Sequence, residues 1–488
     1  MQFVLELPEH SNQPIYKQVC DALRNAIQDG RLRAGEKLPS TRELAESTKV
    51  SRFTVIKSYE LLTAQGFIAT TVGSGTFVTE KGVKERRSEK ELNSDATPIP
   101  ADQRLSVFGK RISQAGAIEP ADAELFAELN YGAPSIDQLP LRQWRQVLNK
   151  CARFQDKTLF QYVSDPLGYM HLREAISSYL GRTRAVNCTS ARIALFSGAQ
   201  SGMDLICRLL LDPGDAVAVE NPGFPGARRM FTSHGAKILT IPVDDEGLVV
   251  EELYRQKAKV KLVYVTPSHQ DPLGVVMSVA RRLELLKWAH KTGGFIFEDD
   301  YDCDYHYGEK PVTALQGLDV ADRVIYLSSF WKVLYPVVRM GFLVLPKRLL
   351  EPVRLARSYL ERDFPLLEQI ALTEFLNDGT LERQIKRTKA LYAKRRAALV
   401  LALRNRFKDR VTIYGVSAGM QLIVQFDQSL DVADILRCTQ EAKLPSVSTE
   451  KFYVGDSRPR EFLIGFAHHT EEELTARVKR MADMLLSP

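Results

Sequence analysis

The stretch Pro39–Ile68, PSTRELAESTKVSRFTVIKSYELLTAQGFI, carries the start and stop signals of two consecutive helices. Ser40 and Glu43 have the spacing of a capping box, in which each side chain satisfies a backbone amide of the other residue at the start of a helix. After a short break, Ser51 is a second candidate N-cap, and apolar residues then recur every three or four positions. Gly66 ends this second helix. The stretch therefore predicts two short helices joined by a tight turn.

The sequence on either side adds a helix before this pair and a hairpin after it. Apolar residues over about 15–29 repeat with a helical period, and β-rich runs at 67–72 and 76–78 meet at Gly73, Ser74 and Gly75. Three helices followed by a glycine-tipped hairpin make a winged helix-turn-helix, a fold that binds DNA. We place this domain at residues 10–79.

Basic and hydroxyl side chains gather near the start of the third predicted helix. Between Lys49 and Tyr59 there are three basic residues and no acidic one, whereas residues 1–79 carry nine Lys and Arg against eight Asp and Glu. Arg and Lys suit base edges and phosphates, and hydroxyls at helix starts donate to phosphates. The alternative is a small helical domain with a solvated basic face. The candidate DNA-binding residues are Ser40, Ser51, Arg52, Thr54 and Lys57.

The quoted stretch, followed by GSGTFV at 73–78, resembles the DNA-binding domain of GntR-type transcription regulators. This resemblance implies that Arg42, Arg52 and Thr54 recognise an operator. It also implies that the wing tip lies near the minor groove; the tip consists of Gly73, Ser74 and Gly75.

Length and composition limit the other possibilities. A chain of 488 residues predicts two or three domains, because one core rarely grows beyond about 250–300 residues. With 44% hydrophobic and 26% charged residues, the chain is typical of a globular protein rather than a disordered, collagenous or coiled-coil one. It has no run long enough for a membrane helix, no secretory signal, and six cysteines without CxxC spacing. We therefore expect a cytoplasmic protein with reduced thiols and no metal site.

The chain beyond residue 80 predicts a linker and then a larger domain. The segment 81–104 is densely charged and has almost no large apolar residues, which is typical of a linker. Seven β-rich runs follow, separated in part by helical segments, and predict an α/β domain with a mostly parallel seven-stranded sheet. The runs are 193–197, 216–220, 237–243, 262–267, 295–299, 324–328 and 341–345. Long helices after about residue 350 and short strands at 421–426 and 462–467 predict a small C-terminal α+β subdomain.

Residues that carry chemistry follow several of these strands, where open α/β sheets place their ligands. Ser197-Gly198-Ala199-Gln200 leads from a strand into a helix and could hold a phosphate. Acidic residues at 298–302 end another strand, and Lys332 and Arg339 follow the next one. A desolvated lysine attacks an aldehyde, and a pyridine cofactor needs a carboxylate at its ring nitrogen and an anion site for its phosphate. As an ordered set these residues indicate a site for pyridoxal 5'-phosphate (PLP), although singly they also suit an Mg²⁺ site or solvated charges.

The order of these motifs over about 124–488 resembles that of the fold-type I aminotransferases. The resemblance implies that Lys332 forms the internal aldimine with PLP. It also implies that Asp299 pairs with the pyridinium nitrogen and that Tyr301 bonds the ring hydroxyl. The residues that would hold the phosphate are Ser197, Gly198, Ala199, Gln200 and Arg339.

Three further cofactor contacts follow from the same resemblance. Phe224, in NPGFPGARR, would stack on the ring. Asp271 stands where aminotransferases have an asparagine that donates to the ring hydroxyl, and a carboxylate cannot donate unless it is protonated. Tyr162 would reach the phosphate of a partner subunit, which implies a homodimer.

A GntR-type head joined to an aminotransferase-like domain is similar to the MocR family of bacterial regulators, and so are the motifs VYVTPSHQDPLGVVMS and FEDDYDCDYHY. On this resemblance we assign three parts to the chain. They are a DNA-binding domain at 10–79, a linker at 80–123, and an aminotransferase-like PLP-binding and dimerisation domain at 124–488.

Two departures from the aminotransferase pattern concern the substrate more than the cofactor. Leu463 stands where aminotransferases have the arginine that holds a substrate carboxylate, and Arg458 or Arg460 could replace it. Trp331 stands where a small hydroxylated residue usually precedes the lysine. For His269 we expect local hydrogen bonding, with a proton shuttle as the alternative.

The sequence therefore predicts a regulator with weak or absent transaminase activity and no catalytic residues. It would bind operator DNA as a homodimer and respond to PLP or an amino compound through Lys332, as in family members that control vitamin B6 synthesis. The first alternative is an active PLP-dependent aminotransferase with an appended DNA-binding domain. The second is a PLP-free regulator in which the aminotransferase fold serves only for dimerisation.

Overall fold

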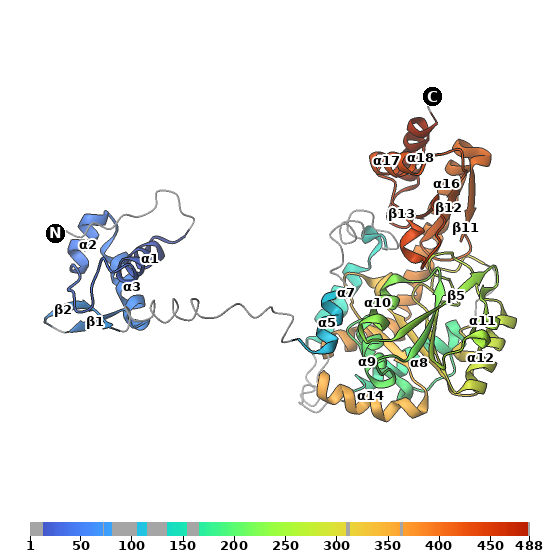
Figure 1. Cartoon of the computed structure of the whole chain (residues 1–488), viewed down its shortest axis with the longest axis horizontal. Helices are drawn as coiled ribbons and strands as arrows, with labels where there is room; N and C mark the ends of the chain where they lie inside the picture. Colours follow the sequence, from blue (N-terminus) through green and yellow to red (C-terminus); the bar gives the residue numbers. More distant parts are fainter. Residues whose placement is uncertain are drawn as a thin grey trace. The chain divides into compact units, whose positions relative to one another are not determined.

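The computed structural model describes residues 13–71, 73–80, 105–114, 134–153, 165–308, 313–361 and 365–486. The chain divides into two compact units, Met1–Arg104 and Leu105–Pro488, whose described elements are drawn in blue and in cyan to red (Figure 1). The predicted linker at 81–104 lies outside the described residues.

The smaller unit contains the three helices and the hairpin that the sequence predicts. Its elements are α1 (Ile15–Gln28), α2 (Thr41–Thr48), α3 (Arg52–Ala64), β1 (Ile68–Thr71) and β2 (Gly75–Val78). The Ser40 hydroxyl accepts a hydrogen bond from the Glu43 amide and the Glu43 carboxylate accepts one from the Ser40 amide, so the capping box is present. Ser51 caps α3, and Lys49 makes the turn between α2 and α3 with a left-handed φ of 56°. Buried apolar side chains from all five elements form one core.

The tip of the hairpin requires glycine. Gly73 and Gly75 have φ angles of +82° and +119°, a region that side chains rarely adopt. A Cβ on Gly75 would also lie 2.5 Å from Cε of Lys37. Lys37 forms a β-bridge with Phe77, so the wing is held against the segment that precedes α2.

The larger unit is built on one sheet of eight strands in the order β3-β10-β9-β8-β7-β4-β5-β6. The strands are β3 (Ile193–Phe196), β4 (Ala216–Asn221), β5 (Lys237–Asp244), β6 (Gly247–Leu248), β7 (Val260–Val265), β8 (Phe295–Asp299), β9 (Val324–Ser329) and β10 (Gly341–Val344). The five strands from β9 to β5 run parallel, whereas β10 is antiparallel to both of its neighbours. All seven predicted strands are present, but the predicted number was wrong by one. The eighth, β6, pairs with β5 over two residues, which is too short for any hydrophobic period.

Helices cover both faces of this sheet. They are α7 (Leu141–Cys151), α8 (Met170–Arg184), α9 (Ala199–Leu210), α10 (Pro225–Ser233), α11 (Val250–Arg255), α12 (Val279–Thr292), α13 (Trp331–Leu334), α14 (Lys347–Leu360) and α15 (Leu366–Asn377). Side chains of α9, α10 and α14 share one apolar cluster with one face of the sheet. Those of α11 and α12, and of α8 and α15, share two clusters with the other face. The sheet is therefore buried on both sides, as its near-continuous apolar strands predict.

Part of the predicted 80–123 linker belongs to the larger unit. Residues Val107–Gln114 form helix α5, which contacts α10. The Phe108 ring lies 5.1 Å from the His234 ring, and the Arg208 guanidinium lies 5.8 Å from the Phe108 ring. The prediction that these eight residues belong to the linker was therefore wrong. They pack against a helix that is more than a hundred residues away in the sequence, and the composition of a short segment does not indicate such a contact.

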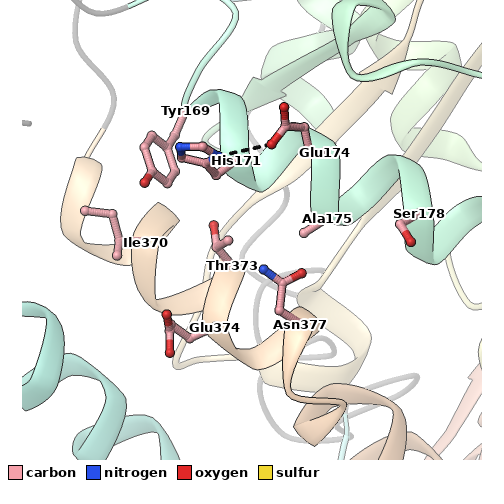
Figure 2. A pocket seen from close by; sticks show the side chains of 9 residues that line it. All are labelled: Tyr169, His171, Glu174, Ala175, Ser178, Ile370, Thr373, Glu374 and Asn377. Carbon is pink, nitrogen blue, oxygen red and sulfur yellow. Dashed lines mark hydrogen bonds and ion pairs between the residues drawn. The ribbon is translucent and has the colours of Figure 1, made fainter.

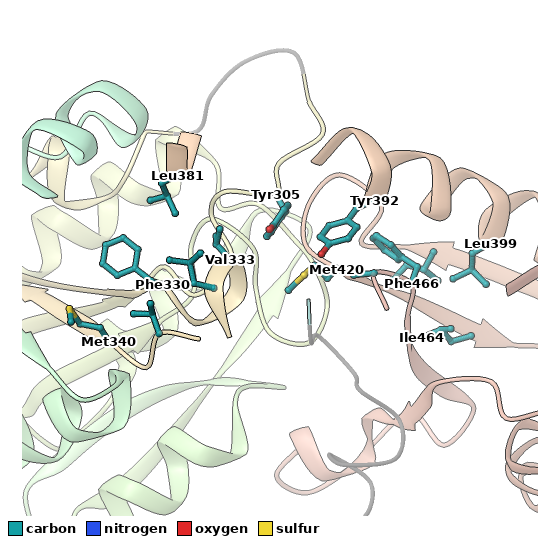
Figure 3. Packing of buried hydrophobic residues seen from close by; sticks show 14 of the residues in the cluster. Tyr305, Phe330, Val333, Met340, Leu381, Tyr392, Leu399, Met420, Ile464 and Phe466 are labelled. Carbon is teal, nitrogen blue, oxygen red and sulfur yellow. The ribbon is translucent and has the colours of Figure 1, made fainter. Parts of the chain in front are cut away.

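The C-terminal part forms the expected small subdomain. Its sheet has the order β11-β12-β14-β13, and the prediction missed two of these short strands. The elements are α16 (Thr380–Phe407), β11 (Val411–Tyr414), β12 (Gln421–Phe426), α17 (Val432–Glu441), β13 (Ser446–Ser448), β14 (Glu461–Gly465) and α18 (Glu471–Leu485). Figure 3 shows the cluster in which Tyr305 of the body meets Tyr392 of α16, with ring centres 5.1 Å apart. One continuous core therefore joins this subdomain to the large sheet.

Candidate cofactor site and DNA-binding surface

Strand pairing brings two of the predicted cofactor groups to one edge of the large sheet. Gly341, at the start of β10, pairs with Phe196 at the end of β3 and with Ser329 at the end of β9. Ser197 directly follows Phe196, and Lys332 lies three residues after Ser329, in the short helix α13. The predicted phosphate site and the predicted lysine therefore lie at the same edge.

Lys332 is half-buried and lies near several carboxylates. Burial lowers the pKa of Lys332, and the charges of Asp302, Asp271 and Asp299 oppose this effect. Its Nζ atom lies 5.6 Å from the centre of the Tyr301 ring. A lowered pKa increases the fraction of neutral amine, which is the form that attacks an aldehyde. The structure thus gathers four predicted cofactor residues, namely Lys332, Asp299, Asp271 and Tyr301.

Asp299 ends β8 and is only 8% exposed. The Tyr264 hydroxyl donates a hydrogen bond of 2.6 Å to its carboxylate. Burial raises the pKa of Asp299 to about 7; the Tyr264 hydrogen bond lowers it, and neighbouring carboxylates raise it further. A carboxylate buried in this way is stabilised by a cationic hydrogen-bond donor, and a protonated pyridine nitrogen is such a donor. The residues present therefore fit the ring of PLP.

An ion pair that sequence reasoning missed fixes the loop after β8. Arg184, at the end of α8, donates to both carboxylate oxygens of Asp300 at 2.9 and 3.0 Å. The Tyr326 hydroxyl donates to the same carboxylate at 2.7 Å. Burial raises the pKa of Asp300, but Arg184 and these hydrogen bonds hold it below its usual value. Because Asp300 lies between Asp299 and Tyr301, the pair restrains both predicted cofactor residues.

The predicted phosphate site is the N-terminus of α9. Gly198 is its N-cap, and the space that a Cβ would take there is open. Gly341 passes so close that a Cβ on it would lie 2.9 Å from the Ala199 nitrogen. Amides in the first turn of a helix have no partner within the helix and bind phosphate readily. The other predicted members of this site are exposed, namely Ser197, Gln200 and Arg339.

Of the three remaining predicted cofactor residues, the structure describes Phe224 and Asp271. Phe224 is the half-buried N-cap residue of α10, and a Cβ on Gly226 would lie 2.5 Å from its ring. Asp271 is buried after β7, and its amide donates to the Thr266 hydroxyl at 3.1 Å. Tyr162 lies outside the described residues. Ring stacking by Phe224 and a partner contact by Tyr162 stay predictions.

His269 makes hydrogen bonds at this edge. Its Nδ1 atom lies 2.7 Å from the Asp302 carboxylate and 3.0 Å from the Tyr301 hydroxyl. His269 therefore connects Asp302 with Tyr301 through one ring nitrogen, which is the local hydrogen bonding that the sequence predicts for it.

The bulky side chain of Trp331 occupies space next to the amine of Lys332. The centre of its ring lies 4.9 Å from Nζ of Lys332 and 4.7 Å from the Tyr335 ring. The indole ring therefore lies beside the amine, in the place in which aminotransferases have a small hydroxylated residue.

The place of the substrate-carboxylate arginine is apolar. Leu463 is fully buried in a cluster with Ile423, Val447 and Phe452. Both arginines that could replace it are engaged elsewhere. Arg458 donates to Glu461 at 3.3 Å, and Arg460 donates to the Leu430 carbonyl at 2.7 Å. A substrate α-carboxylate therefore gains no bidentate partner from these positions.

On the smaller unit, the predicted DNA-binding residues lie at the N-cap and first turn of α2, at the N-cap and first two turns of α3, and at the wing. The Ser51 and Thr54 hydroxyls bond each other at 2.7 Å and close the first turn of α3. Arg52 is exposed. Arg42 is exposed as well, and it pairs with Glu46 at 3.4 Å.

Two basic residues of this unit have contacts that the sequence did not indicate. Nζ of Lys57 lies 4.1 Å from the centre of the Tyr16 ring, so α1 orients a predicted phosphate contact. Lys37 lies against Gly75 at the wing and was not among the predicted residues. Its position follows from the β-bridge to Phe77, which connects residues forty positions apart.

A hollow of about 390 Å³ lies between α8 and α15, apart from the predicted residues (Figure 2). It is lined by Tyr169, His171, Glu174, Ala175, Ser178, Ile370, Thr373, Glu374 and Asn377. His171 bonds Glu174 at 3.0 Å, and Lys150 bonds Glu374 at 2.5 Å. Within the described ranges, no group of three His, Cys, Asp or Glu side chains is placed to hold a metal ion. Over the same ranges, no helix has the length and apolar character to cross a membrane.

Known proteins match both units of the chain. Residues 126–481 match the family "Aminotransferase class I and II", and residues 15–78 match "Bacterial regulatory proteins, gntR family". The probable rhizopine catabolism regulatory protein MocR of Rhizobium meliloti is 34% identical over 439 residues, 90% of this chain and 87% of that protein. The pyridoxine biosynthesis transcriptional regulator PdxR of Corynebacterium glutamicum is 26% identical over 482 residues, 98% of each chain.

Solved structures show the fold of the larger unit. Kynurenine aminotransferase of Pyrococcus horikoshii, in complex with PMP, matches with a TM-score of 0.70 and 26% identity over 80% of this chain and 99% of that one. The predicted fold class, a winged helix-turn-helix joined to a fold-type I transferase domain, is confirmed. With a gntR-type domain, an aminotransferase domain and similarity to MocR over most of its length, the chain belongs to the MocR-type transcription regulators.

Proposed function

We propose that this DNA-binding regulator binds PLP through Lys332 and responds to the bound cofactor. The observation that carries the proposal is the gathering of Lys332, Asp299 and Asp271 at the strand edge that also carries the α9 amides. PLP supplies an aldehyde that forms a Schiff base with a lysine amine. Asp299 would hold the ring nitrogen, Tyr301 the ring hydroxyl, and the first turn of α9 with Arg339 the phosphate.

The loss of the carboxylate arginine supports binding without efficient turnover. Four residues proposed to hold the cofactor, Lys332, Asp299, Tyr301 and Arg339, are retained, whereas Leu463 and its apolar neighbours occupy the place of the substrate clamp. An amino acid would then be poorly anchored through its carboxylate. We therefore propose that PLP itself is the signal, with an amino compound lacking a carboxylate as the second candidate.

A PLP signal has to reach the DNA through a change in conformation. A ligand shifts a regulator only if it binds one conformation more tightly than another. We propose that cofactor binding orders the edge around Lys332 in a cytoplasmic homodimer, with Tyr162 contributed from the partner, and changes how two DNA-binding domains engage their half-sites. The names of two relatives, a pyridoxine biosynthesis regulator and a probable rhizopine catabolism regulator, agree with control of vitamin B6 or amino-compound metabolism.

The first prediction concerns the lysine. Lys332→Ala should abolish the visible absorbance band that appears when PLP is added, because the substitution removes the amine on which the charges of Asp299 and Asp271 act. Lys347→Ala, which changes an exposed lysine at the start of α14, should keep the band. After borohydride reduction, mass mapping of the wild type should find the adduct on Lys332, and an adduct on a different peptide would contradict the assignment.

The second prediction concerns pH and the cofactor-free protein. Burial raises the pKa of Asp299 to about 7 in the folded state, from the ordinary value of 3.8. The unfolded chain therefore releases this proton first, so the contribution of Asp299 to the free energy of unfolding should fall as pH rises from about 4 to about 7 and then level off. Asp299→Asn should show a smaller fall, as measured by urea unfolding at a series of pH values. Equal pH dependence in both proteins would show that Asp299 ionises normally.

The third prediction concerns DNA. Arg52→Ala should weaken operator binding in a gel-shift assay by roughly tenfold, the order of one bidentate base contact, without changing PLP uptake. A matched control is Arg31→Ala, which removes an exposed arginine beyond α1. Unchanged affinity of the Arg52 variant would remove this residue from the recognition surface.

The fourth prediction separates this function from a working aminotransferase. Wild-type protein loaded with PLP should convert little or none of it to pyridoxamine phosphate when a panel of amino acids is added. Rapid spectral conversion with any of them would favour the enzyme, and a protein that stays colourless with excess PLP would favour the PLP-free scaffold.

A further inference from the structure

Phe53 is an exposed aromatic residue on the helix that carries the predicted DNA contacts. Its side chain is 75% exposed, at the second position of α3, directly between Arg52 and Thr54. Ile15, at 55%, is the other strongly exposed large apolar residue in the described part of the smaller unit. A single exposed apolar side chain is ordinary on a protein surface. Phe53 is of interest because it lies on α3 among the residues predicted to contact DNA.

The core of the smaller unit fixes the direction in which Phe53 points. Val55, Tyr59 and Leu62 are the apolar residues that α3 buries against the rest of the unit. At about 100° per residue, Phe53 lies roughly half a turn around the helix from these three. Lys57, one turn further along, lies on the same side as Phe53 and is exposed too. Phe53 therefore projects from the face of α3 that lies opposite the core.

In helix-turn-helix proteins this outer face of the second helix of the motif enters the major groove, and its first residues contact the base edges. The first turn of α3 is held rigid by the hydrogen bond between Ser51 and Thr54 and by the N-cap. The phenyl ring of Phe53 carries no hydrogen-bond donor or acceptor, so it cannot form hydrogen bonds with the polar edges of the bases. The apolar group that the major groove offers is the C5-methyl group of thymine.

We propose that Phe53 determines sequence specificity by contacting the methyl group of a thymine in each half-site. This inference rests on the DNA-binding part of the proposed function and is independent of PLP. Arg52 and Lys57 would bind the polar groups on either side of the methyl group. A wedge between base pairs is a different use of an aromatic residue and occurs in the minor groove, to which the wing rather than α3 is assigned.

The test starts from DNA selected by the full-length protein from a random-sequence duplex library. In the selected duplex, each thymine is replaced in turn by deoxyuridine, which differs only in lacking the methyl group. For the wild type, replacement of one particular thymine in each half-site should lower the affinity about fourfold. This factor corresponds to the free energy of burying one methyl group. Phe53→Ala should bind the thymine and deoxyuridine duplexes equally and should weaken binding to the parent duplex by a similar factor or more.

Two control variants keep the result unambiguous. Phe53→Leu retains an apolar side chain and should keep part of the methyl preference. Ile15→Ala removes an exposed apolar residue at the start of α1 and should keep all of the methyl preference. Because Phe53 is exposed, the alanine variant should keep its circular dichroism spectrum and thermal transition.

Each outcome decides something. A deoxyuridine effect of equal size in the wild type and Phe53→Ala, or no sensitive thymine at all, would overturn the role of Phe53 and leave the DNA-binding function standing. Failure of the full-length protein to enrich any duplex, with and without PLP, would overturn both.

Discussion

The buried ion pair between Arg184 and Asp300 is the constraint on which the cofactor edge depends. Taking two charges out of water is costly, and only near-ideal geometry with further hydrogen bonds offsets that cost. Here the guanidinium contacts both carboxylate oxygens, and the Tyr326 hydroxyl adds a third bond. The pair joins the end of α8 to the end of β8, so the backbone on either side of Asp300 has little freedom. The predicted contacts to the ring nitrogen and the ring hydroxyl lie on those two sides.

The charges around this edge suit cofactor binding better than amino-acid chemistry. The charges of Asp302, Asp271 and Asp299 act on the amine of Lys332, and the amides that suit a phosphate follow β3, which is separated from β9 by β10. The position that would hold a second anion, the substrate carboxylate, is filled by Leu463 and other apolar side chains. A domain of this kind can register the presence of a cofactor, whereas rapid turnover needs an anchored substrate. Such a division of roles is physically reasonable for a regulator built on an enzyme fold.

The smaller unit shows how local signals and long-range contacts share one recognition surface. Caps at Ser40 and Ser51 fix where α2 and α3 begin, and the core residues of α3 fix which face is turned outward. Contacts across the unit then orient individual cations, as with Lys57 over Tyr16 and Lys37 against Gly75. The resulting surface combines charge for affinity with an apolar side chain, Phe53, for discrimination.

The sequence by itself determined the features that depend on near neighbours. Capping pairs and apolar periods predicted the three helices and the hairpin. Apolar runs predicted seven of the eight strands of the large sheet, and the order of motifs along the chain indicated the family. Only the tertiary structure decided the rest: the partner of Asp300, the hydrogen bond from Arg460 to the Leu430 carbonyl, the pairing of β6 and the docking of α5. These contacts join residues that are distant in sequence, or involve segments too short to show a hydrophobic period. They form only when the chain packs, so no local sequence pattern indicates them.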